Sequence, residues 1–432
     1  MNVLVLGGGG REHAIVSKLR QSPRVTTLVC APGNGGIARE ARCLPVDLND
    51  ADATVTLVQS LTPDLTVVGP EIPLALGVVD RLQALGLRVF GPTQAAARLE
   101  SSKSFAKSFM QSTGIPTAAY ALCGTLDEVR SELPRFSAPV VVKASGLAAG
   151  KGVVICETHH EAESVAAQMF SGELLGSAVD EIVLEEFLTG DELSFFALCD
   201  GKHAVPLAAA QDHKRVGEGD TGPNTGGMGA YSTDALLPPA LRDWLTANVA
   251  QPVVDHMASA GTPFTGILFT GIMMVPDPDG PVLFTHGNVR PMVLEFNTRF
   301  GDPETQAILL RLESDLLDLF EAAIDGKADE VEIRLKPGAA ACVIAASGGY
   351  PGKYASGLPI TGLPEDADDL KVFHSGTKLA ADGTVLTAGG RVLAVTATAP
   401  TLSDALARAY RALEGIHFEE MHYRRDIGRR AR

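Results

Sequence analysis

The sequence predicts an α/β protein of two or three domains that begins with a parallel sheet. Its 432 residues fit that number of domains at ~150 residues each. From residue 2 to about residue 100, short apolar runs alternate with helical patterns, as in parallel strands joined by helices. The chain is rich in glycine, with 45 residues, and many follow the apolar runs. Because open α/β sheets bind ligands at the carboxyl ends of their strands, these loops are the first candidates for a binding site.

Composition excludes several classes of protein. Lysine and arginine total 36 against 52 aspartates and glutamates, and a net charge of −16 disfavours a protein that coats nucleic acid. The six cysteines form no C-x-x-C pair and are expected to be buried free thiols. No apolar run approaches the ~20 residues of a membrane span, and the first run is too short for a secretory leader. We therefore expect a cytoplasmic protein with neither a nucleic-acid nor a membrane partner.

Strands of the first domain are predicted at residues 3–6, 25–30, 65–68 and 87–90. The loop after the first strand reads GGGGREH, which resembles the opening of a dinucleotide fingerprint. Glu12 replaces the third glycine of that fingerprint, and the second strand ends without an acid for a ribose hydroxyl. A dinucleotide site is thus disfavoured, and a tight turn without a ligand remains an alternative.

The second region begins with a helical stretch over residues 93–110, which ends before Pro116 and marks a domain boundary. A buried strand at 138–143 then ends in Lys143, and a small-residue loop leads to a second strand at 153–156. A Walker A loop does not fit, because both flanks are strands. The hairpin amides could instead cover phosphates while Lys143 supplies a charge. Lys103, on the helical stretch, could equally lie on a solvated face, and Lys143 could point to solvent from a sheet edge.

Two further segments are candidates for ligand binding. A strand over residues 182–188 and the turn after it carry carboxylates that could hydrogen-bond a nucleoside or be solvated turn charges. Residues 211–231 contain six glycines and few apolar side chains, which predicts a functional loop without regular structure. A mobile lid that makes no direct contact with a ligand is the alternative for this loop.

The segment 293–304 is the most informative. Glu295 and Asn297 are two residues apart on a strand and share a face, so they offer two oxygen ligands suited to magnesium. Asp302 is predicted to cap a helix that starts at Pro303 and runs to about residue 325. The helix N-terminus and Arg299 would together form an anion site. An ordinary capped helix beside a surface Glu–Asn pair is the alternative.

The last region predicts a smaller α/β domain. Strands are expected at 331–335, 341–346 and 392–396, and a helix is expected to open at Thr401. The arginine-rich tail after residue 423 is expected to be a solvated basic terminus.

Five motifs together identify a family. They are GGGGREH (7–13), VGPEIP (68–73), VKASGLAAGKGV (142–153), QDHKRVGEGDTGPNTGGMGAY (211–231) and RFGDPETQ (299–306). Through them the chain resembles the glycinamide ribonucleotide synthetase family of the ATP-grasp superfamily. The resemblance implies an N-terminal parallel-sheet (pre-ATP-grasp) domain at 1–100, an ATP-grasp domain at 101–328 with a mobile lid subdomain at about 118–188, and a small C-terminal α/β domain at 329–432.

The resemblance also implies an activity. Members use ATP with Mg²⁺ or Mn²⁺ to join glycine to 5-phosphoribosylamine through glycyl phosphate, in de novo purine biosynthesis. It implies a monomer with small-molecule substrates, which could contact the preceding enzyme of the pathway transiently. Two alternatives remain: another ATP-grasp enzyme of the same pathway, such as a formate-using transformylase or a carboxylase, and a nucleotide-sensing protein without turnover.

Roles of individual residues follow from the same resemblance. ATP phosphates would be held by Lys103, Lys143 and the hairpin residues Gly146, Gly150, Lys151 and Gly152, the adenine by Glu185, Glu186, Phe187 and Leu188, and the ribose by Glu192. Metal ligands would be Glu295 and Asn297. The catalytic residues would be Arg299, Asp302, Asp212 and Lys214, and the glycine and sugar-phosphate side would be bound by Gly9, Gly10, Arg11, Glu12, Glu71, Arg215, Pro223, Asn224, Thr225, Gly226 and Gly227.

Two features depart from the family pattern. Ser145 stands where members commonly carry aspartate before the hairpin glycine, so that carboxylate's role is open here. The stretch 275–291 is longer than the usual hairpin and is expected to be a surface insertion.

Overall fold

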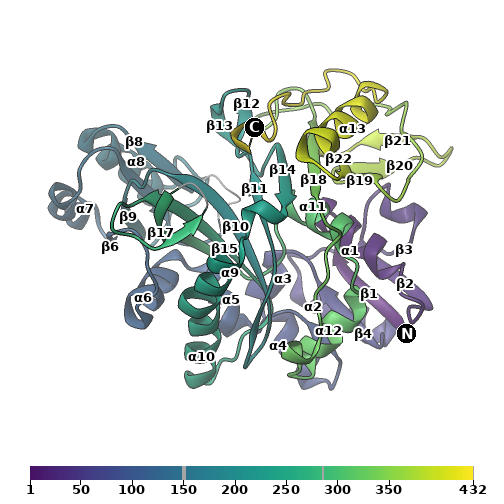
Figure 1. Ribbon diagram of the computed structural model, residues 1–432, viewed down its shortest axis with the longest axis horizontal. Coiled ribbons are helices and arrows are strands. Elements are labelled where there is room, and N and C mark those ends of the chain that lie inside the picture. Colours follow the sequence, from purple (N-terminus) through teal and green to yellow (C-terminus); the bar gives the residue numbers. More distant parts are fainter. Residues whose placement is uncertain (148–151, 285–286, 432) are drawn as a thin grey trace.

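A computed structural model of the chain describes residues 1–147, 152–284 and 287–431 (Figure 1). Parallel and antiparallel sheets are combined with helices, which confirms the predicted α/β class. Three sheets of five, nine and four strands organise the molecule. Within the described ranges no helix is both long and apolar enough to cross a membrane.

The N-terminal sheet is parallel, in the order β3-β2-β1-β4-β5. Apolar runs form its central strands because helices cover both faces of such a sheet. The predicted strands are confirmed, whereas β3 has only two residues and too little pattern to predict. The bounds are β1 Asn2–Gly7, β2 Thr27–Pro32, β3 Arg42–Cys43, β4 Leu65–Val68, β5 Val89–Phe90, α1 Gly10–Leu19, α2 Ala51–Leu61, α3 Glu71–Ala75 and α4 Val78–Ala84.

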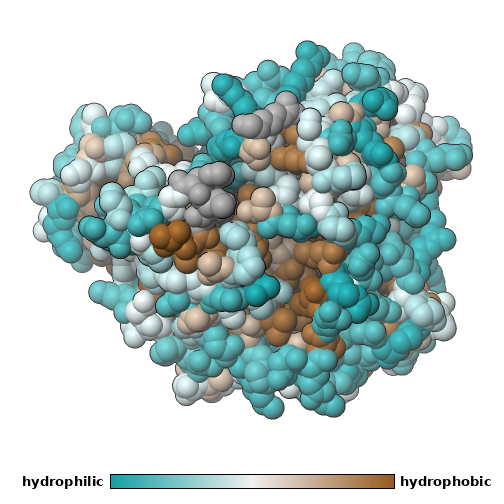
Figure 2. All heavy atoms as spheres, in the orientation of Figure 1, coloured by the Kyte–Doolittle hydropathy of each residue, from teal (hydrophilic) through white to brown (hydrophobic). Residues whose placement is uncertain are grey.

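A four-stranded antiparallel sheet forms a separate lobe, in the order β6-β9-β7-β8. The lobe has its own apolar core, and in Figures 1 and 2 it projects from the left of the main body. Thr125 and Thr158 cap its two α-helices, each accepting a hydrogen bond from a first-turn amide. The bounds are β6 Tyr120–Cys123, β7 Val140–Ala144, β8 Val153–Cys156, β9 Ile182–Glu186, α7 Leu126–Glu132 and α8 His159–Ser171.

The nine-stranded sheet forms the spine of the molecule, in the order β16-β17-β15-β10-β11-β14-β18-β22-β19. Its last three strands come from the C-terminal part of the chain, so one sheet continues from the central region into that part. The bounds are β10 Asp191–Asp200, β11 Ala204–Asp212, β14 Gly229–Thr233, β15 Thr265–Pro276, β16 Val282–Phe284, β17 Gly287–Asn297, β18 Ala339–Ala346, β19 Leu370–His374 and β22 Arg391–Ala399.

Helices cover both faces of this sheet. One apolar cluster lies beneath α5, α6, α9 and α10, and a second joins the N-terminal domain to α11 and α12. Phe90 of β5 stacks on Phe320 of α12 with 4.0 Å between ring centroids. The bounds are α5 Gln94–Ser101, α6 Lys103–Thr113, α9 Pro239–Leu245, the π-helix Thr246–Ala250, α10 Gln251–Ser259, α11 Glu304–Arg311, α12 Leu316–Ile324 and α13 Leu402–Glu414.

Short elements complete the fold. Two small hairpins pair β12 with β13 and β20 with β21, apart from the larger sheets. The bounds are β12 Arg215–Gly217, β13 Thr221–Asn224, β20 Thr377–Leu379 and β21 Val385–Thr387, with 3-10 helices at Ile37–Arg39, Leu133–Arg135, Asp234–Leu236, Ala328–Glu330 and Arg429–Ala431.

The predicted helix from Pro303 to residue 325 is wrong as a single element. It is two helices, because Asp315 starts α12 by accepting a hydrogen bond from the amide of Leu317. Asp302 is not the cap: Pro303 occupies that position and Glu304 is the first helical residue. The stretch 93–110 is likewise divided, since Ser102 caps α6 through the amide of Phe105.

Three other expectations are corrected. Residues 211–231 are not without regular structure, because they contain β12, β13 and the start of β14. No strand forms at 331–335, where a single bridge from Leu335 to Leu312 replaces a ladder. The C-terminal tail is solvated only in part: Arg425, Arg429 and Arg430 are exposed, whereas Arg424 is fully buried and pairs with two aspartates. The surface insertion is a longer β15–β17 hairpin that carries β16.

Candidate active site

Two lysines from different elements converge on one glutamate at the base of the lobe. Lys143 of β7 and Glu185 of β9 share a sheet face, and their charged atoms Nζ and Oε2 are 2.9 Å apart. Lys107 of α6 reaches the same oxygen at 3.2 Å. Burial lowers the pKa of Lys107 to about 8, helped by the positive Lys143 and opposed by Glu185. Glu185 therefore orients Lys143, and Lys107 is a member of the site that the sequence did not indicate.

Lys103 faces the same space from the first turn of α6. Its Nζ donates to the carbonyl of Gly146 at 3.1 Å, so it contacts the loop that follows β7. Burial lowers the pKa of Lys103, Lys143 lowers it further, and Glu295 opposes both. Ser145 accepts a hydrogen bond from the amide of Ser104 at 3.3 Å, which ties this loop to α6. Gly152 is buried and accepts from the amide of Ala144, whereas Gly150 and Lys151 lie outside the described residues.

The end of β9 leads from the lysines to a second ion pair. Glu186 is exposed and Phe187 and Leu188 are half-buried. In β10, Glu192 pairs with Lys214. Burial opposes the charge on Lys214, but Glu192 and the other carboxylates nearby outweigh it and raise its pKa. The residues expected to contact the adenine and the ribose thus lie at the end of β9 and the start of β10. Lys214 already occupies the carboxylate of Glu192, which is expected to bind the ribose.

Glu295 and Asn297 occupy the facing edge of β17. Burial alone would raise the pKa of Glu295, yet Lys214, Lys143 and Lys103 lower it, so its carboxylate is charged. A bulge at residue 294 lies directly before Glu295 and directs its side chain. Within the described part of the chain, no hydrogen bond or ion pair engages the carboxylate of Glu295.

The amide of Asn297 is also only half satisfied. Its Oδ1 accepts from Arg299 at 3.1 Å, whereas its buried Nδ2 has no partner among the described residues. A rotation of the amide group would turn its oxygen to that open side. A free carboxylate beside such an amide fits a hard divalent cation, which prefers oxygen ligands.

Arg299 joins the first domain to this edge. Its Nη2 lies 2.7 Å from Glu100 of α5 and its Nε 3.5 Å from Glu71 of α3. Burial opposes the charge on Arg299, but Glu100 and Glu71 raise its pKa further above the usual value. Glu100 was missed by sequence reasoning because an acid near a helix end gives no signal for such a contact.

The glycine-rich loop after β1 is closely packed by polar groups. The amide of Gly9 donates to the carboxylate of Glu12 at 2.7 Å, and Arg11 donates to the carbonyl of Gly69 at 3.0 Å. A Cβ on Gly10 would lie 2.5 Å from Ser375 Oγ and 2.5 Å from Gln306 Nε2. A larger residue at this position would force Ser375 and Gln306 away from the N-terminus of α1, so glycine allows this close packing.

Asp302 lies opposite this loop and is held by Arg391, another residue that the sequence did not indicate. Arg391 donates to the backbone carbonyls of Asp302 at 2.7 Å and Gly226 at 2.6 Å, and its Nη2 lies 3.4 Å from the Asp302 carboxylate. Burial opposes ionisation of Asp302, but Arg391 and Arg11 outweigh it and lower its pKa. Ser375 Oγ and Gln306 Oε1 are buried here without partners among the described residues.

Asp212 adds a carboxylate with an unusual pKa. Burial raises its pKa to about 8, Lys214 opposes this, and repulsion from Glu304 adds to it. Glu304, the first residue of α11, is also buried and accepts from Ser194 at 3.1 Å. Burial also raises the pKa of Glu304, against the lowering by Lys214, Arg299 and its own hydrogen bonds.

Only some of the residues expected to bind substrate at 223–227 lie near Asp302. Thr225 donates to the carbonyl of Lys214 at 2.8 Å, and a Cβ on Gly227 would meet Pro303 at 2.5 Å. Pro223 and Asn224 are exposed, and Arg215 donates to the carbonyl of Gly222 within its own hairpin. The structure therefore brings Thr225, Gly226 and Gly227 toward Asp302 and leaves the others on the outer face.

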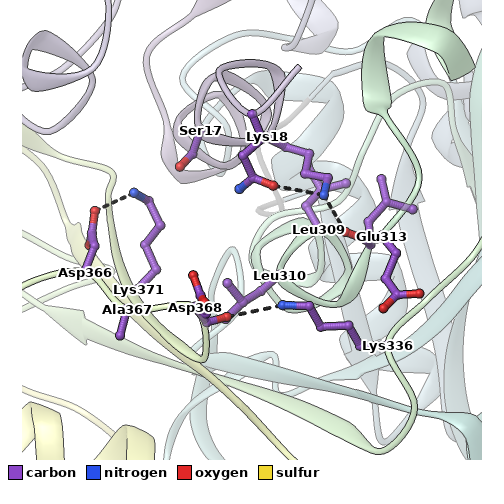
Figure 3. A pocket seen from close by; sticks show the side chains of 12 residues that line it. Ser17, Lys18, Leu309, Leu310, Glu313, Lys336, Asp366, Ala367, Asp368 and Lys371 are labelled. Carbon is purple, nitrogen blue, oxygen red and sulfur yellow. Dashed lines mark hydrogen bonds and ion pairs between the residues drawn. The ribbon is translucent and has the colours of Figure 1, made fainter. Parts of the chain in front are cut away.

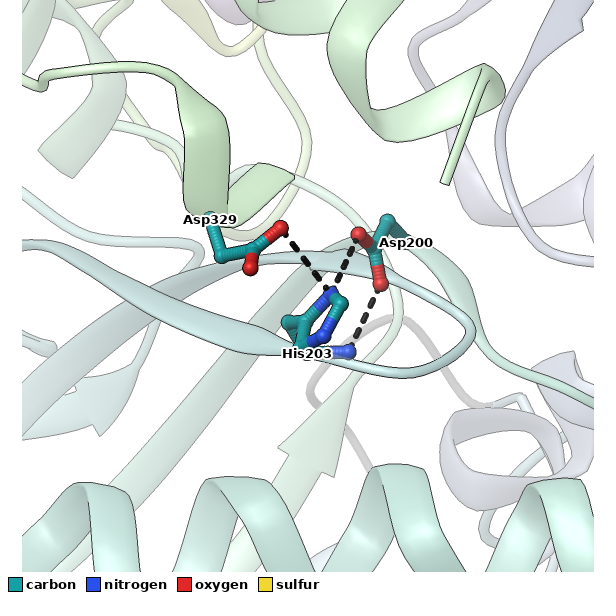
Figure 4. A group of neighbouring side chains, drawn as sticks. All are labelled: Asp200, His203 and Asp329. Carbon is teal, nitrogen blue, oxygen red and sulfur yellow. Dashed lines mark hydrogen bonds and ion pairs between the residues drawn. The ribbon is translucent and has the colours of Figure 1, made fainter. Parts of the chain in front are cut away.

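Two other polar groups lie outside this cluster. A cavity of about 530 Å³ is bordered by α1, α11 and residues 366–371, and its lysines Lys18, Lys336 and Lys371 are balanced by nearby carboxylates (Figure 3). The second group joins Asp200, His203 and Asp329, with His203 Nδ1 at 2.9 and 3.3 Å from the two carboxylates (Figure 4). Asp200 also accepts from the amides of His203 and Ala328, which indicates a structural cross-link.

Comparison with known proteins identifies the family. The models for the phosphoribosylglycinamide synthetase N domain, ATP-grasp (A) domain and C domain match residues 1–100, 101–305 and 340–430. The chain belongs to the phosphoribosylglycinamide synthetase family. It is 49% identical to a phosphoribosylamine–glycine ligase of Xanthomonas axonopodis pv. citri, over 100% of this chain and 98% of the relative. It is 48% identical to one of Vibrio cholerae serotype O1, with the same coverage.

Solved structures agree with the phosphoribosylglycinamide synthetase assignment. A phosphoribosylamine–glycine ligase of Thermotoga maritima superposes with a TM-score of 0.83 at 33% identity, over 99% of this chain and 100% of that one. The biotin carboxylase domain of the Hydrogenobacter thermophilus 2-oxoglutarate carboxylase gives a TM-score of 0.74 at 18% identity, over 98% and 91%, and shares the fold alone. The family expected from the five motifs is confirmed.

Proposed function

We propose that the chain is an ATP-dependent ligase that joins glycine to 5-phosphoribosylamine and releases ADP and phosphate, a step of purine biosynthesis. The observation that carries the proposal is the match to phosphoribosylamine–glycine ligases along the whole chain. The geometry supports it, because lysines from α6 and β7 and the arginine after β17 face the unengaged carboxylate of Glu295. Charge stabilisation of this kind dominates phosphoryl transfer.

The nucleotide would lie between the lobe and β17. Lys103 and Lys143 would hold its phosphates, and Gly146, Gly150, Lys151 and Gly152 would contact the same phosphates. Glu186 to Leu188 would follow the adenine. Glu192 would bind the ribose. Its carboxylate would then contact both the ribose and Lys214. Glu185 would keep Lys143 aimed at the phosphates rather than line the adenine.

Glu295 and Asn297 would hold Mg²⁺ or Mn²⁺, as their unengaged oxygen and half-satisfied amide suggest. When bound, such an ion neutralises charge on the phosphates and the transferring group. Arg299, anchored by Glu100 and Glu71, would add a fixed positive charge beside the acyl phosphate. Because the folded protein already holds this charge in position, little reorganisation is needed during the reaction.

The amine substrate would lie on the opposite side, against the N-terminal domain. Gly9, Gly10, Arg11 and Glu12 would surround its phosphoribosyl group with Glu71. The buried, unpartnered Ser375 Oγ and Gln306 Oε1 offer hydrogen bonds there. Asp302 would face the amine or ribose.

Asp212 and Lys214 would lie on the glycine side, with the hairpin residues Arg215 and 223–227 closing over the substrates. A glycine carboxylate oxygen would attack the terminal phosphorus of ATP, and ADP would leave. The amine would then attack the carbonyl carbon, phosphate would leave, and the amine would lose a proton. Asp212, with its pKa near 8, is suited to accept that proton.

Assembly and location complete the proposal. The protein would act as a monomer in the cytoplasm, with a transient contact to the enzyme that supplies phosphoribosylamine. All six cysteines are free, which fits a reducing compartment.

The test is phosphate release by the purified chain with ATP, Mg²⁺, glycine and phosphoribosylamine, followed by the product's mass. Release that needs both glycine and the amine, with a ribonucleotide product, supports the proposal. Release that depends on formate or bicarbonate instead would favour the transformylase or carboxylase alternatives. Lys143→Met should abolish turnover, whereas Lys353→Met, which changes an exposed lysine, should not.

A further inference from the structure

The C-terminal segment docks on the hairpin formed by β12, β13 and the turn between them, residues 215–224. Figure 1 shows the C-terminus beside β12 and β13. His422 donates to the carbonyl of Val216 at 3.0 Å, and the amide of Arg425 donates to Glu218 at 3.2 Å. The amide of Gly428 donates to His213 at 3.2 Å. Contacts therefore run along the hairpin from its base to its tip.

Arg424 is the centre of this interface and is only 1% exposed. Its guanidinium makes a bidentate pair with Asp426, at 2.8 Å for each bond, and lies 2.9 Å from Asp220 in the hairpin turn. It also donates to the carbonyl of Arg215 at 3.0 Å. Arg430 adds a second bond to Asp220 at 2.7 Å. A planar fork with this many acceptors fixes position as well as charge.

Val216 at the base of the hairpin packs against the main apolar core, but the rest of the hairpin lies at the surface. Among the described residues its two strands pair only with each other, and residues 218–224 are exposed. At its far end Tyr350 accepts from the amide of Gly226, and Arg391 donates to the carbonyls there. At the turn of the hairpin, Arg424 and Arg430 of the C-terminal segment supply the ion pairs that hold it in place.

The hairpin leads directly into the candidate active site. Asp212 and Lys214 face its carboxylates, while His213 between them faces the tail. Burial lowers the pKa of His213 to about 4, helped by Arg424 and Arg430, so its ring is neutral and Nε2 can accept from Gly428. Asp212 and Lys214 thus face the candidate active site, and His213 between them contacts the C-terminal segment.

We propose that Arg424 is a positioning residue, through which the C-terminal segment fixes the β12–β13 hairpin and so places Asp212 and Lys214 before it and residues 225–227 after it. The inference rests on the proposed function, because it takes this hairpin to close over glycine and the sugar phosphate. Arg424 touches no reacting group itself. Its loss alters the placement of the hairpin, and a small displacement of positioned groups is costly to turnover.

The first test compares Arg424→Met with Arg425→Met in the full chain. Arg425 is an exposed neighbour whose side chain makes no ion pair among the described residues, so it is the matched control. Arg424→Met should lower kcat on the order of 10- to 100-fold while the KM for ATP changes by less than about twofold. Arg424→Lys keeps the charge without the fork and should recover part of kcat.

A second measurement is independent of activity. Endoproteinase Glu-C should cut after the exposed Glu218 at least about fivefold faster in Arg424→Met than in Arg425→Met, because local opening of the hairpin becomes easier. If Arg424→Met does not fold, Asp220→Asn takes its place. It removes the negative charge that both arginines contact and one of the two acceptor oxygens, and asparagine tolerates the positive φ of 57° at that position.

The outcomes separate the two proposals. Equal kcat and equal cleavage in Arg424→Met and Arg425→Met, or in Asp220→Asn and wild type, would overturn the positioning role. Parallel losses in kcat and ATP affinity would overturn it too, since they indicate general damage. If the wild type makes no ribonucleotide but the difference in cleavage persists, the docking stands and the proposed function fails.

Discussion

Replacement of Arg391 by methionine tests whether the C-terminal strands hold the candidate site together. Arg391 is largely buried and contacts the carbonyls of Asp302 and Gly226 and the carboxylate of Asp302. Removal of one partner of a buried ion pair costs about 3–5 kcal/mol, because the other charge is left uncompensated. We expect Arg391→Met to lower the free energy of unfolding by that amount at pH 7.

Arg408→Met is the matched control. Arg408 pairs with Asp369 on an exposed surface, so its loss should cost about 0–1 kcal/mol. Both variants would be measured by urea unfolding at several pH values. Arg391 lowers the pKa of Asp302, so in the wild type the ionised form stabilises the fold above pH ~4, and this contribution is lost as pH falls. The gap between wild type and Arg391→Met should therefore stay constant from pH 7 to pH ~4 and narrow below pH ~4, as pH falls through the lowered pKa of Asp302. Equal destabilisation by the two variants, or a gap that widens in acid, would refute the reasoning.

Three further predictions concern the charges of the site. Glu295→Ala and Arg299→Ala should each lower kcat by orders of magnitude with an unchanged circular dichroism spectrum, and near-normal turnover would show the site is misplaced. Removal of divalent ions with EDTA should stop turnover, and added Mg²⁺ should restore it in the wild type but not in Glu295→Ala. Lys107 has a pKa of about 8, below its usual 10.5, so the unfolded chain binds more protons between these values and stability should rise with pH there. Lys107→Met should lose that rise in urea unfolding, and a persistent slope would assign it to another group.

The sequence predicted well those parts of the fold that local pattern determines. Apolar runs located the N-terminal strands, and Thr401 marked the start of α13, where its side chain accepts from the amide of Asp404. The two errors in helix length arose where a polar side chain interrupts a helical pattern. Ser102 and Asp315 each start a new helix, and both were read as interior positions of a longer one.

Site residues divide in the same way. Glu295 and Asn297 share a face because a strand alternates, and that relation can be read from spacing alone. Lys107, Glu100 and Arg391 reach the site only through tertiary packing, and Arg391 is 89 residues beyond Asp302 in the chain. No local pattern distinguishes such residues from ordinary surface charges. The burial of Arg424 was missed for the same reason, because its partner Asp220 is 204 positions away.

The continuous nine-stranded sheet has a consequence for how the chain can be divided. Because β14 pairs with β18, a truncation before residue 339 would strip one side of β14 and leave a row of unpaired amides and carbonyls. An unpaired edge strand of this kind promotes aggregation with other chains. By contrast, the four-stranded lobe and the five-stranded N-terminal sheet each use strands from one continuous part of the chain, so either could be excised or exchanged without breaking a strand pairing.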